Sequence, residues 1–229
     1  MTPLSHTVSL ARSEREPTQI ASTLETYRSI ARTRPSLRSS PRALGSMDGF
    51  DCGGHPGEED VGNWVLLAKA GAKLNIPFVA SGGCANGKQL AAALAMGACG
   101  MNMGTRFMAT TEAPIHENIK KALVDHDERS TTHIFRTVQN TERVFKNSQA
   151  MKVRAIEAEH PGDFSKIYPL VRGELYRQSF QESGNIESSV WSCGQSIGLI
   201  EDIVPCEQLL QRTVEEAASI MRTRLPAML

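Results

Sequence analysis

The residues of this chain best suited to chemistry are one histidine and three short glycine-containing segments. Cys52–Glu58 reads CGGHPGE and is followed by Ser81-Gly82-Gly83 and then by Gly104-Thr105. Glycines at the ends of strands leave bare backbone N–H groups that can bind a phosphate, and a threonine hydroxyl can donate to a phosphate oxygen. A histidine in the first of these segments, His55, supplies a side chain of the kind that moves protons near neutral pH. The pattern predicts a phosphate-bearing cofactor bound beside a candidate base, His55.

Each of these residues also has a structural explanation. A tight turn explains either glycine loop alone equally well, and only the two together favour a phosphate site. Arg106 either offsets phosphate charge or pairs with a helix carboxylate, whereas Cys52 and Cys84 are expected to be small buried residues. Polar surroundings also give no special role to His116, His126, His133 and His160, and the sequence contains no cluster of metal ligands, so we expect no metal site.

Repeated strand–loop–helix units are expected to position these loops. Short apolar runs predict strands at Ile76–Ser81 and Cys99–Met103, and helices are predicted at Lys88–Met96 and Pro114–Val124. A helix is also predicted after Glu58, with an apolar face made of Val61, Trp64, Val65, Ala68 and Ala72. Tandem units of this kind give parallel strands covered by helices, so we expect an α/β fold. The helix N-terminus at Gly87 would add to the anion site.

Beyond Asp125 the pattern is weaker. Thr131–Val138 is predicted to be extended, and Phe164–Tyr176 to be helical with a kink or break at Pro169. A last helix is predicted to end before Pro226, with an apolar stripe made of Leu210, Val214, Ala217, Ala218 and Met221.

Composition excludes several classes of protein. Twenty-five basic and twenty-five acidic residues cancel, which gives no reason to expect nucleic acid or an anionic membrane as a partner. No apolar run approaches the ~20 residues that span a bilayer. Five scattered cysteines without CxxC spacing favour a reducing compartment, and we expect a cytoplasmic protein. Residues 1–45, rich in Arg, Ser and Pro, are predicted to be disordered or unrelated to the domain, with a transit peptide as the less favoured alternative.

Several ordered motifs from Met47 onward resemble one family. These are GFDCGGHPGE at 49–58, PFVASGG at 77–83, NMGTRF at 102–107, EAPIHENIK at 112–120 and WSCGQ at 191–195. They are similar to the FMN-dependent nitronate monooxygenases, also called 2-nitropropane dioxygenases. The similarity covers the chain almost to its C-terminus.

The resemblance implies a TIM-type barrel with a small, mainly helical domain inserted near its end. Residues 46–125 would form about the last three βα units of a partial flavin-binding (β/α) barrel, 126–185 the inserted subdomain, and 186–229 the return to the barrel and the final helix. It also implies the cofactor FMN and the oxidation of alkyl nitronates, or nitroalkanes, by O2 to carbonyl compounds and nitrite. His55 would be the catalytic base. The implied cofactor-binding residues are Gly54, Ser81, Gly82, Gly83, Gly104, Thr105, Gly194 and Gln195.

The length of the matching region leaves alternatives open, because a (β/α)8 barrel takes about 250 residues. The chain is either a working flavoenzyme, completed by another chain or by self-association through exposed barrel edges, or a truncated and impaired member that keeps only the FMN-phosphate half-site. Another FMN-dependent barrel oxidoreductase, such as an enoyl reductase, is the third alternative.

Overall fold

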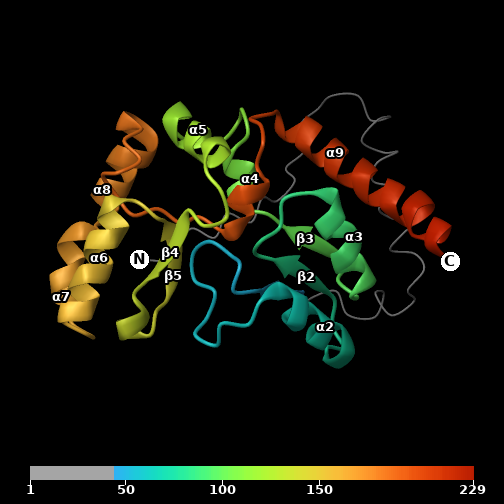
Figure 1. The fold of residues 1–229 in the computed structure, drawn as a ribbon, viewed down its shortest axis with the longest axis horizontal. Coiled ribbons are helices and arrows are strands. Elements are labelled where there is room, and N and C mark those ends of the chain that lie inside the picture. Colours follow the sequence, from blue (N-terminus) through green and yellow to red (C-terminus); the bar gives the residue numbers. More distant parts are fainter. Residues whose placement is uncertain (1–43) are drawn as a thin grey trace. The chain divides into compact units, whose positions relative to one another are not determined.

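A three-stranded parallel sheet forms the first part of the fold. A computed structural model describes residues 44–229 (Figure 1), and the expectations for residues 1–43 lie outside this range. Strands β1 (Gly45–Asp48), β2 (Phe78–Ser81) and β3 (Gly100–Asn102) pair in the order β1-β2-β3. The predicted α/β class and both predicted strands are confirmed, with slightly shorter bounds.

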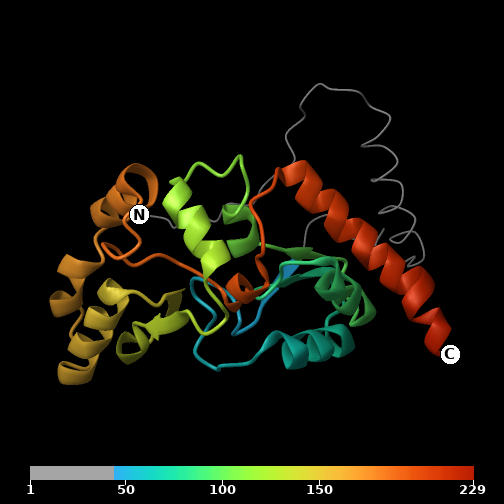
Figure 2. The same cartoon turned by 45° about the horizontal axis from the view of Figure 1, so that its top comes forward.

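Helices α2 (Asn63–Lys73) and α3 (Gly87–Ala95) pack against this sheet (Figures 1 and 2). Leu67 and Ala70 of α2 are buried in a cluster with Phe78 and Ala80 of β2 and Ala93 of α3. A helix that covers a sheet needs only one apolar stripe, and in α2 the residues three apart at 67 and 70 supply it.

The predicted apolar face of α2 is wrong. Trp64 is 74% exposed and Val65 62% exposed, and Ala68 and Ala72 are exposed as well. The helix begins at Asn63, so Val61 lies outside it. The prediction was based on the longest series of apolar residues at helical spacing. The residues that pack against the sheet, Leu67 and Ala70, lie on the other side of the helix.

Helix α9 (Cys206–Ser219) packs along α3 and continues as a π-helix, η6 (Ile220–Arg224), followed by the short η7 (Pro226–Met228). Its predicted end before Pro226 is confirmed, but its predicted stripe is correct only in part. The buried residues are Leu209, Thr213 and Ala217, whereas Leu210 is 42% exposed. The stripe begins one residue earlier because α3 approaches closely: a Cβ on Gly87 would lie 2.4 Å from the carbonyl oxygen of Thr213.

An antiparallel hairpin and short helices form the second part. The hairpin consists of β4 (Thr131–Ile134) and β5 (Glu142–Phe145), joined through η2 (Arg136–Val138). Helices α6 (Ser148–Glu159), α7 (Phe164–Ile167), η3 (Tyr168–Leu170), α8 (Gly173–Arg177) and η4 (Gln178–Ser183) follow. The predicted extended segment is confirmed for Thr131–Ile134. The predicted helix around Pro169 is broken there, whereas β5 and α6 were not predicted.

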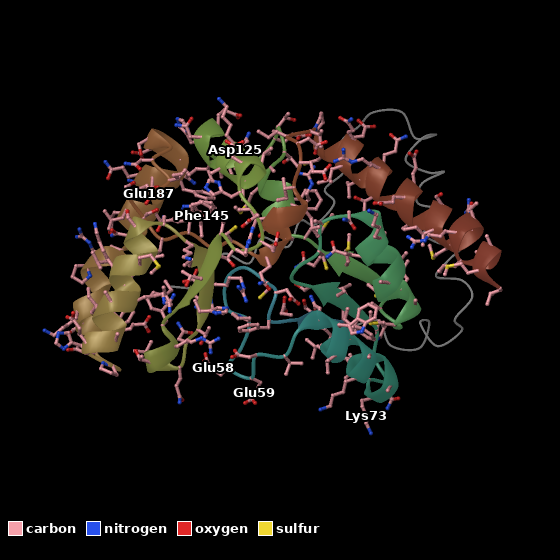
Figure 3. All side chains as sticks on the ribbon, viewed as in Figure 1. Glu58, Glu59, Lys73, Asp125, Phe145 and Glu187 are labelled. Atoms are coloured by element: carbon pink, nitrogen blue, oxygen red, sulfur yellow. The ribbon has the colours of Figure 1, made fainter. Side chains whose placement is uncertain are left out.

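A buried aromatic cluster lies between these two parts. Phe145 of β5 (Figure 3) stacks on Trp191 at 4.4 Å between ring centroids. Both are buried with residues of α5 (Glu117–Asp125) and η5 (Gln195–Leu199), which lie beside α4 (Thr105–Met108).

The predicted helix at Pro114–Val124 corresponds to α5. Within residues 44–229, no helix is both long and apolar enough to cross a bilayer.

Candidate functional site

The three parallel strands end at one edge of the sheet, where loops carry the predicted site residues. Asp48 pairs with Ser81 and Ser81 pairs with Asn102, so the strands end at the same level. The Asn102 amide donates to the Ser81 hydroxyl across this edge at 3.2 Å. Ligands of open α/β sheets bind outside the carboxyl ends of the strands. The fold therefore brings the three predicted loops together.

The two glycines after β2 allow a close contact with the loop after β1. Gly82 and Gly83 have φ values of +82° and +68°, a region that favours glycine. A Cβ on Gly82 would lie 2.5 Å from the Cβ of Cys52, and one on Gly83 would lie 2.8 Å from the Cβ of Asp51. The turn explanation of these glycines is therefore confirmed, and their phosphate contacts remain a prediction.

Protein groups already cap the N-terminus of α3. The N–H of Gln89 donates to the Asn86 side chain at 3.2 Å, and the Gln89 side chain accepts from the N–H of Asn86 at 3.3 Å. The N–H of Gly87 donates to the Glu216 carboxylate of α9 at 2.8 Å. A negative charge is favoured at this end of a helix. The anion predicted at Gly87 is thus a carboxylate of the protein itself.

The loop after β3 offers both space and a donor. A Cβ on Gly104 would meet no atom within 4 Å. The Thr105 hydroxyl accepts a hydrogen bond from the N–H of Gly194 at 2.9 Å, and within the described residues it donates to no protein group. Its hydrogen is therefore free to donate to an anion. Among the predicted phosphate ligands, Gly104 and Thr105 have the most suitable surroundings.

The segment after Trp191 returns to the same edge. The N–H of Gln195 donates to the carbonyl oxygen of Asp51 at 3.0 Å. A Cβ on Gly194 would lie 2.8 Å from the nitrogen of Gly53, and one on Gly53 would lie 2.6 Å from the nitrogen of Gly194. Only glycine permits this approach of two backbones. The structure thus places Gly194 and Gln195 against the loop that carries His55.

His55 lies in the long loop between β1 and α2, and its side chain is exposed. The preceding residue, Gly54, forms an antiparallel bridge with Arg143 of β5, through bonds of 3.1 Å and 2.7 Å. Within residues 44–229 the imidazole makes no hydrogen bond of its own. Its nitrogens are therefore available to a substrate.

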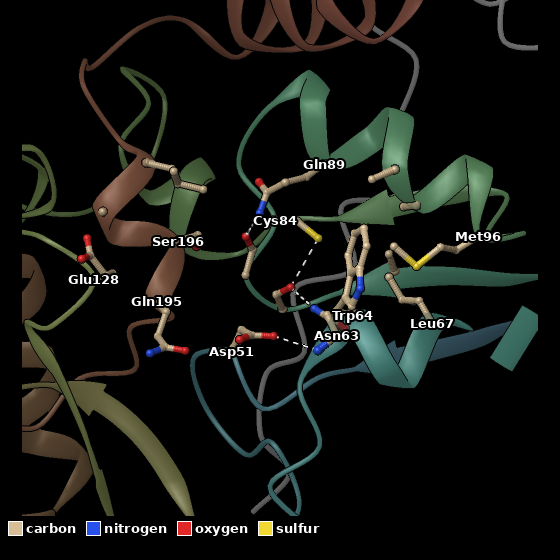
Figure 4. A pocket seen from close by; sticks show the side chains of 17 residues that line it. Asp51, Asn63, Trp64, Leu67, Cys84, Gln89, Met96, Glu128, Gln195 and Ser196 are labelled. Atoms are coloured by element: carbon tan, nitrogen blue, oxygen red, sulfur yellow. Dashed lines mark hydrogen bonds between the residues drawn. The ribbon is translucent and has the colours of Figure 1, made fainter. Parts of the chain in front are cut away.

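A pocket of about 430 Å³ adjoins the loop after β2 (Figure 4). Its polar end is formed by Asp51, Asn63 and the Gly82-Gly83 loop, and its apolar end by Trp64 with residues of α2 and α3. Of the predicted site residues, Gly82, Gly83 and Gln195 line it, whereas Gly54, His55, Ser81, Gly104, Thr105 and Gly194 do not. The pocket thus represents one side of the predicted site and does not reach the candidate base.

Asn63 is a site residue that sequence analysis missed. Its backbone N–H donates to the Asp51 carboxylate at 2.9 Å, and its side-chain amide donates to the carbonyl oxygens of Ser81, at 2.8 Å, and Gly82. Its Oδ1 is buried and accepts no hydrogen bond from the described residues. A buried acceptor of this kind is costly unless a donor reaches it. The sequence feature that could have indicated Asn63 is its position as the first residue of a helix, directly after Gly62.

Arg106 has a structural role: it pairs with a carboxylate, as one of its two predicted alternatives had it, but the partner, Asp202, lies before α9 and not in a helix. It is 2% exposed and pairs with the Asp202 carboxylate at 2.5 Å, and it donates to the carbonyl oxygens of Asp202 and Ala109 at 3.0 Å and 3.3 Å. Burial lowers the pKa of the guanidinium, which Asp202 opposes. The side chain is therefore committed to the segment before α9.

Burial keeps the two cysteines of the loops protonated. It raises the pKa of Cys52 to about 11 and that of Cys84 to about 12, and nearby aspartates add to both shifts. A nucleophilic cysteine needs a lowered pKa. The prediction that these are small buried residues agrees with this.

Comparison with known proteins identifies the family. The family model described as nitronate monooxygenase matches residues 44–216. A dehydrogenase of 5-hydroxy-7a-methyl-1-oxo-octahydro-1H-indene-4-carboxyl-CoA from Rhodococcus jostii is 29% identical, covering 75% of this chain and 58% of that protein. A nitronate monooxygenase from Paraburkholderia phytofirmans is 28% identical, covering 77% of this chain and 50% of that protein.

Solved structures show the same similarity. FabK from Thermotoga maritima superimposes with a TM-score of 0.74 at 29% identity, covering 90% of this chain and 61% of that one. A nitroalkane oxidase from Streptomyces ansochromogenes superimposes with a TM-score of 0.66 at 25% identity, covering 88% and 56%. The chain spans between about half and three fifths of the length of these relatives. With the model matched over most of its described residues, the chain belongs to the nitronate monooxygenase family.

Proposed function

We propose that this chain carries the phosphate-binding edge and the proton-transfer loop of an FMN-dependent enzyme that oxidises alkyl nitronates, and nitroalkanes, with O2. Two nitronate ions and one O2 would give two carbonyl compounds and two nitrite ions. The observation that carries the proposal is the meeting of three loops at one sheet edge, with open space at Gly104 and the His55 loop packed against Gly82.

The residues present fit FMN. Gly104 and Thr105 offer space and a free hydroxyl hydrogen to the phosphate, with Gly82 and Gly83 beside them. The pocket of about 430 Å³, lined on one side by Gly82, Gly83 and Gln195, falls within the range of ~300–1,000 Å³ typical of ligand sites. When bound, FMN supplies the redox chemistry, and the protein supplies orientation and proton transfer.

His55 would take the proton next to the nitro group when the substrate is a neutral nitroalkane. A nitronate has already lost that proton, so His55 is needed for one substrate form and not for the other. A positioned general base contributes about 10²- to 10⁴-fold. The exposed imidazole, free of hydrogen bonds to the described residues, is available for this transfer.

The test is to load the purified chain with FMN, remove free flavin and record the visible spectrum with and without ethyl nitronate under anaerobic conditions. We expect a bound yellow chromophore that bleaches. His55→Asn should lower nitroethane oxidation by at least ~10²-fold while FMN binding and ethyl nitronate oxidation persist. His160→Asn, a change at an exposed histidine after α6, is the matched control. Unchanged nitroethane turnover in His55→Asn would refute the base role, and a colourless protein would favour the impaired-fragment alternative.

A second candidate function is the oxidation or reduction of an acyl thioester. The Rhodococcus relative named for a carboxyl-CoA substrate favours it. The same base would then act on the carbon next to a thioester carbonyl. Bleaching of the bound flavin by an acyl-CoA, but not by ethyl nitronate, would support this candidate over the first.

We further propose that the chain forms part of a (β/α) barrel, with the hairpin and helices at 126–185 as an inserted subdomain, and that it acts in the cytoplasm. The exposed Trp64 and Val65 on α2, next to β1, suit contact with further βα units or with a second copy of the chain. Sedimentation of the chain at increasing concentration would test self-association.

A further inference from the structure

The hairpin β4–β5 holds the His55 loop at three points. Gly54 pairs with Arg143 through two backbone hydrogen bonds. The Glu58 carboxylate accepts two hydrogen bonds from Thr141, and the Asp60 carboxylate accepts from Arg136 at 3.0 Å. The first two points lie one residue before and three residues after His55. The hairpin, which belongs to the second part of the fold, therefore holds both sides of the candidate base.

The contact between Glu58 and Thr141 is the closest of the three. One carboxylate oxygen accepts from the Thr141 N–H at 2.7 Å and the other from the Thr141 hydroxyl at 2.6 Å. Thr141 is 1% exposed, so it offers a fixed donor pair. Both bonds lower the pKa of Glu58, and the side chain accepts them as a carboxylate at neutral pH.

The loop has little else to fix it at His55. Gly54 and Gly57 have φ values of +81° and +85°, and a Cβ on Gly57 would meet no atom within 4 Å. His55 itself is exposed. Glycine segments without packing partners sample many conformations. External hydrogen bonds must therefore select the conformation in which the imidazole is presented.

Arg143 stabilises the start of the loop from the same hairpin. Its guanidinium donates to the carbonyl oxygen of Phe50 at 2.8 Å and 3.2 Å and lies 4.8 Å from the centre of the Phe50 ring. Arg143 is 3% exposed. The start of the loop is therefore fixed by Arg143, and its second half is held by Glu58, with Asp60 further along the chain.

We propose that Glu58 and Thr141 form a latch that positions His55, so that the inserted hairpin fixes the candidate base. Both are positioning residues, since they act through the loop and touch no reacting atom. The proposal rests on the proposed base role of His55. It predicts that the latch affects proton abstraction and leaves flavin binding unaffected.

The test compares Glu58→Ala, Glu58→Gln and Thr141→Val with Glu59→Ala. Glu59 is the adjacent exposed carboxylate (Figure 3), and its side chain makes no hydrogen bond within residues 44–229. Amide hydrogen exchange by mass spectrometry is measured on the full chain for peptides covering 53–58 and 139–143. Melting temperature, FMN affinity, and kcat and KM for nitroethane and ethyl nitronate are measured alongside.

We expect faster exchange confined to these two peptides in Glu58→Ala and Thr141→Val, partial rescue in Glu58→Gln, and wild-type exchange in Glu59→Ala. The kcat for nitroethane should fall about 10- to 100-fold, the scale of a ~1 Å misplacement, with ethyl nitronate turnover and FMN affinity unchanged. Unchanged exchange in Glu58→Ala, or faster exchange throughout the chain with a lower melting temperature, would overturn the latch. A wild-type protein without turnover would contradict the proposed function, and the exchange data would still decide the latch.

Discussion

Replacing Gly104 with alanine distinguishes an effect on the stability of the fold from an effect on the proposed phosphate site. Gly104 has φ −98° and ψ −70°, which alanine adopts without strain, and a Cβ there would meet no atom within 4 Å. A compatible Gly→Ala change stabilises a protein by about 0.4–1 kcal/mol, because it restricts the unfolded chain. The variant should therefore fold at least as well as the wild-type chain.

The same methyl group would occupy the space proposed for the FMN phosphate. The phosphate would lose contact with the Thr105 hydroxyl or with a backbone N–H of this loop. A hydrogen bond to a charged group contributes ~1.5–3 kcal/mol, and each 1.4 kcal/mol is a factor of ten in Kd. We therefore expect FMN to bind about 10- to 100-fold more weakly.

Urea unfolding of the flavin-free chain gives the stability, and quenching of flavin fluorescence gives the Kd. Gly173→Ala is the matched control, because a Cβ on Gly173 also meets no atom within 4 Å and the residue begins α8, outside the site loops. It should leave the Kd unchanged. Equal FMN affinity in Gly104→Ala and the wild-type chain would refute the placement of the phosphate at this loop.

Two further predictions concern buried charges and thiols. Asp202→Asn leaves Arg106, which is 2% exposed, without its anion. The free energy of unfolding, measured with urea at pH 7, should fall by about 2 kcal/mol. This is less than the ~3–5 kcal/mol of a fully buried pair, because Asp202 is 36% exposed. Hydrogen bonds from Arg212 and Arg106 hold the pKa of Asp202 below its ordinary value. The difference in stability between the variant and the wild-type chain should therefore persist above about pH 4 and vanish as the pH falls through the lowered pKa. A difference in stability that grows in acid would contradict this account. Burial raises the pKa of Cys52 to about 11 and that of Cys84 to about 12, so iodoacetamide at pH 8 should label both only after urea is added. The partly exposed Cys206 should be labelled first. Rapid labelling of Cys52 in the native chain, detected by peptide mass spectrometry, would contradict the structure.

The strands and loops of the sheet edge were predictable because their signals are local. A short apolar run that ends in glycine predicts both a buried strand and a turn, and β2 followed by Gly82 has both features. The spacing of two such units in tandem then requires parallel strands. The reason for the glycines was not predictable, because Gly82 is needed for its contact with Cys52, thirty positions earlier in the chain.

Contacts between residues far apart in the sequence could not be predicted, for the same reason. The side chains of Glu58 and Thr141 meet although 83 positions separate them, and no local pattern marks either residue. The buried side of α2 depends on which residues face the sheet, and apolar spacing selected Trp64 instead of Leu67. Strand β5 contains the charged residues Glu142 and Arg143, so its apolar content is too low to predict a strand.

The two halves of the candidate site are therefore held by different parts of the fold. The proposed phosphate end depends on the parallel sheet, through Gly82, Gly104 and Thr105. The candidate base depends on the hairpin, through the contacts of Gly54 with Arg143 and of Glu58 with Thr141. A change in the hairpin should alter proton transfer without altering cofactor affinity, and a change at Gly104 should do the reverse. Variants at the two ends should combine additively, since they share no hydrogen-bond partner.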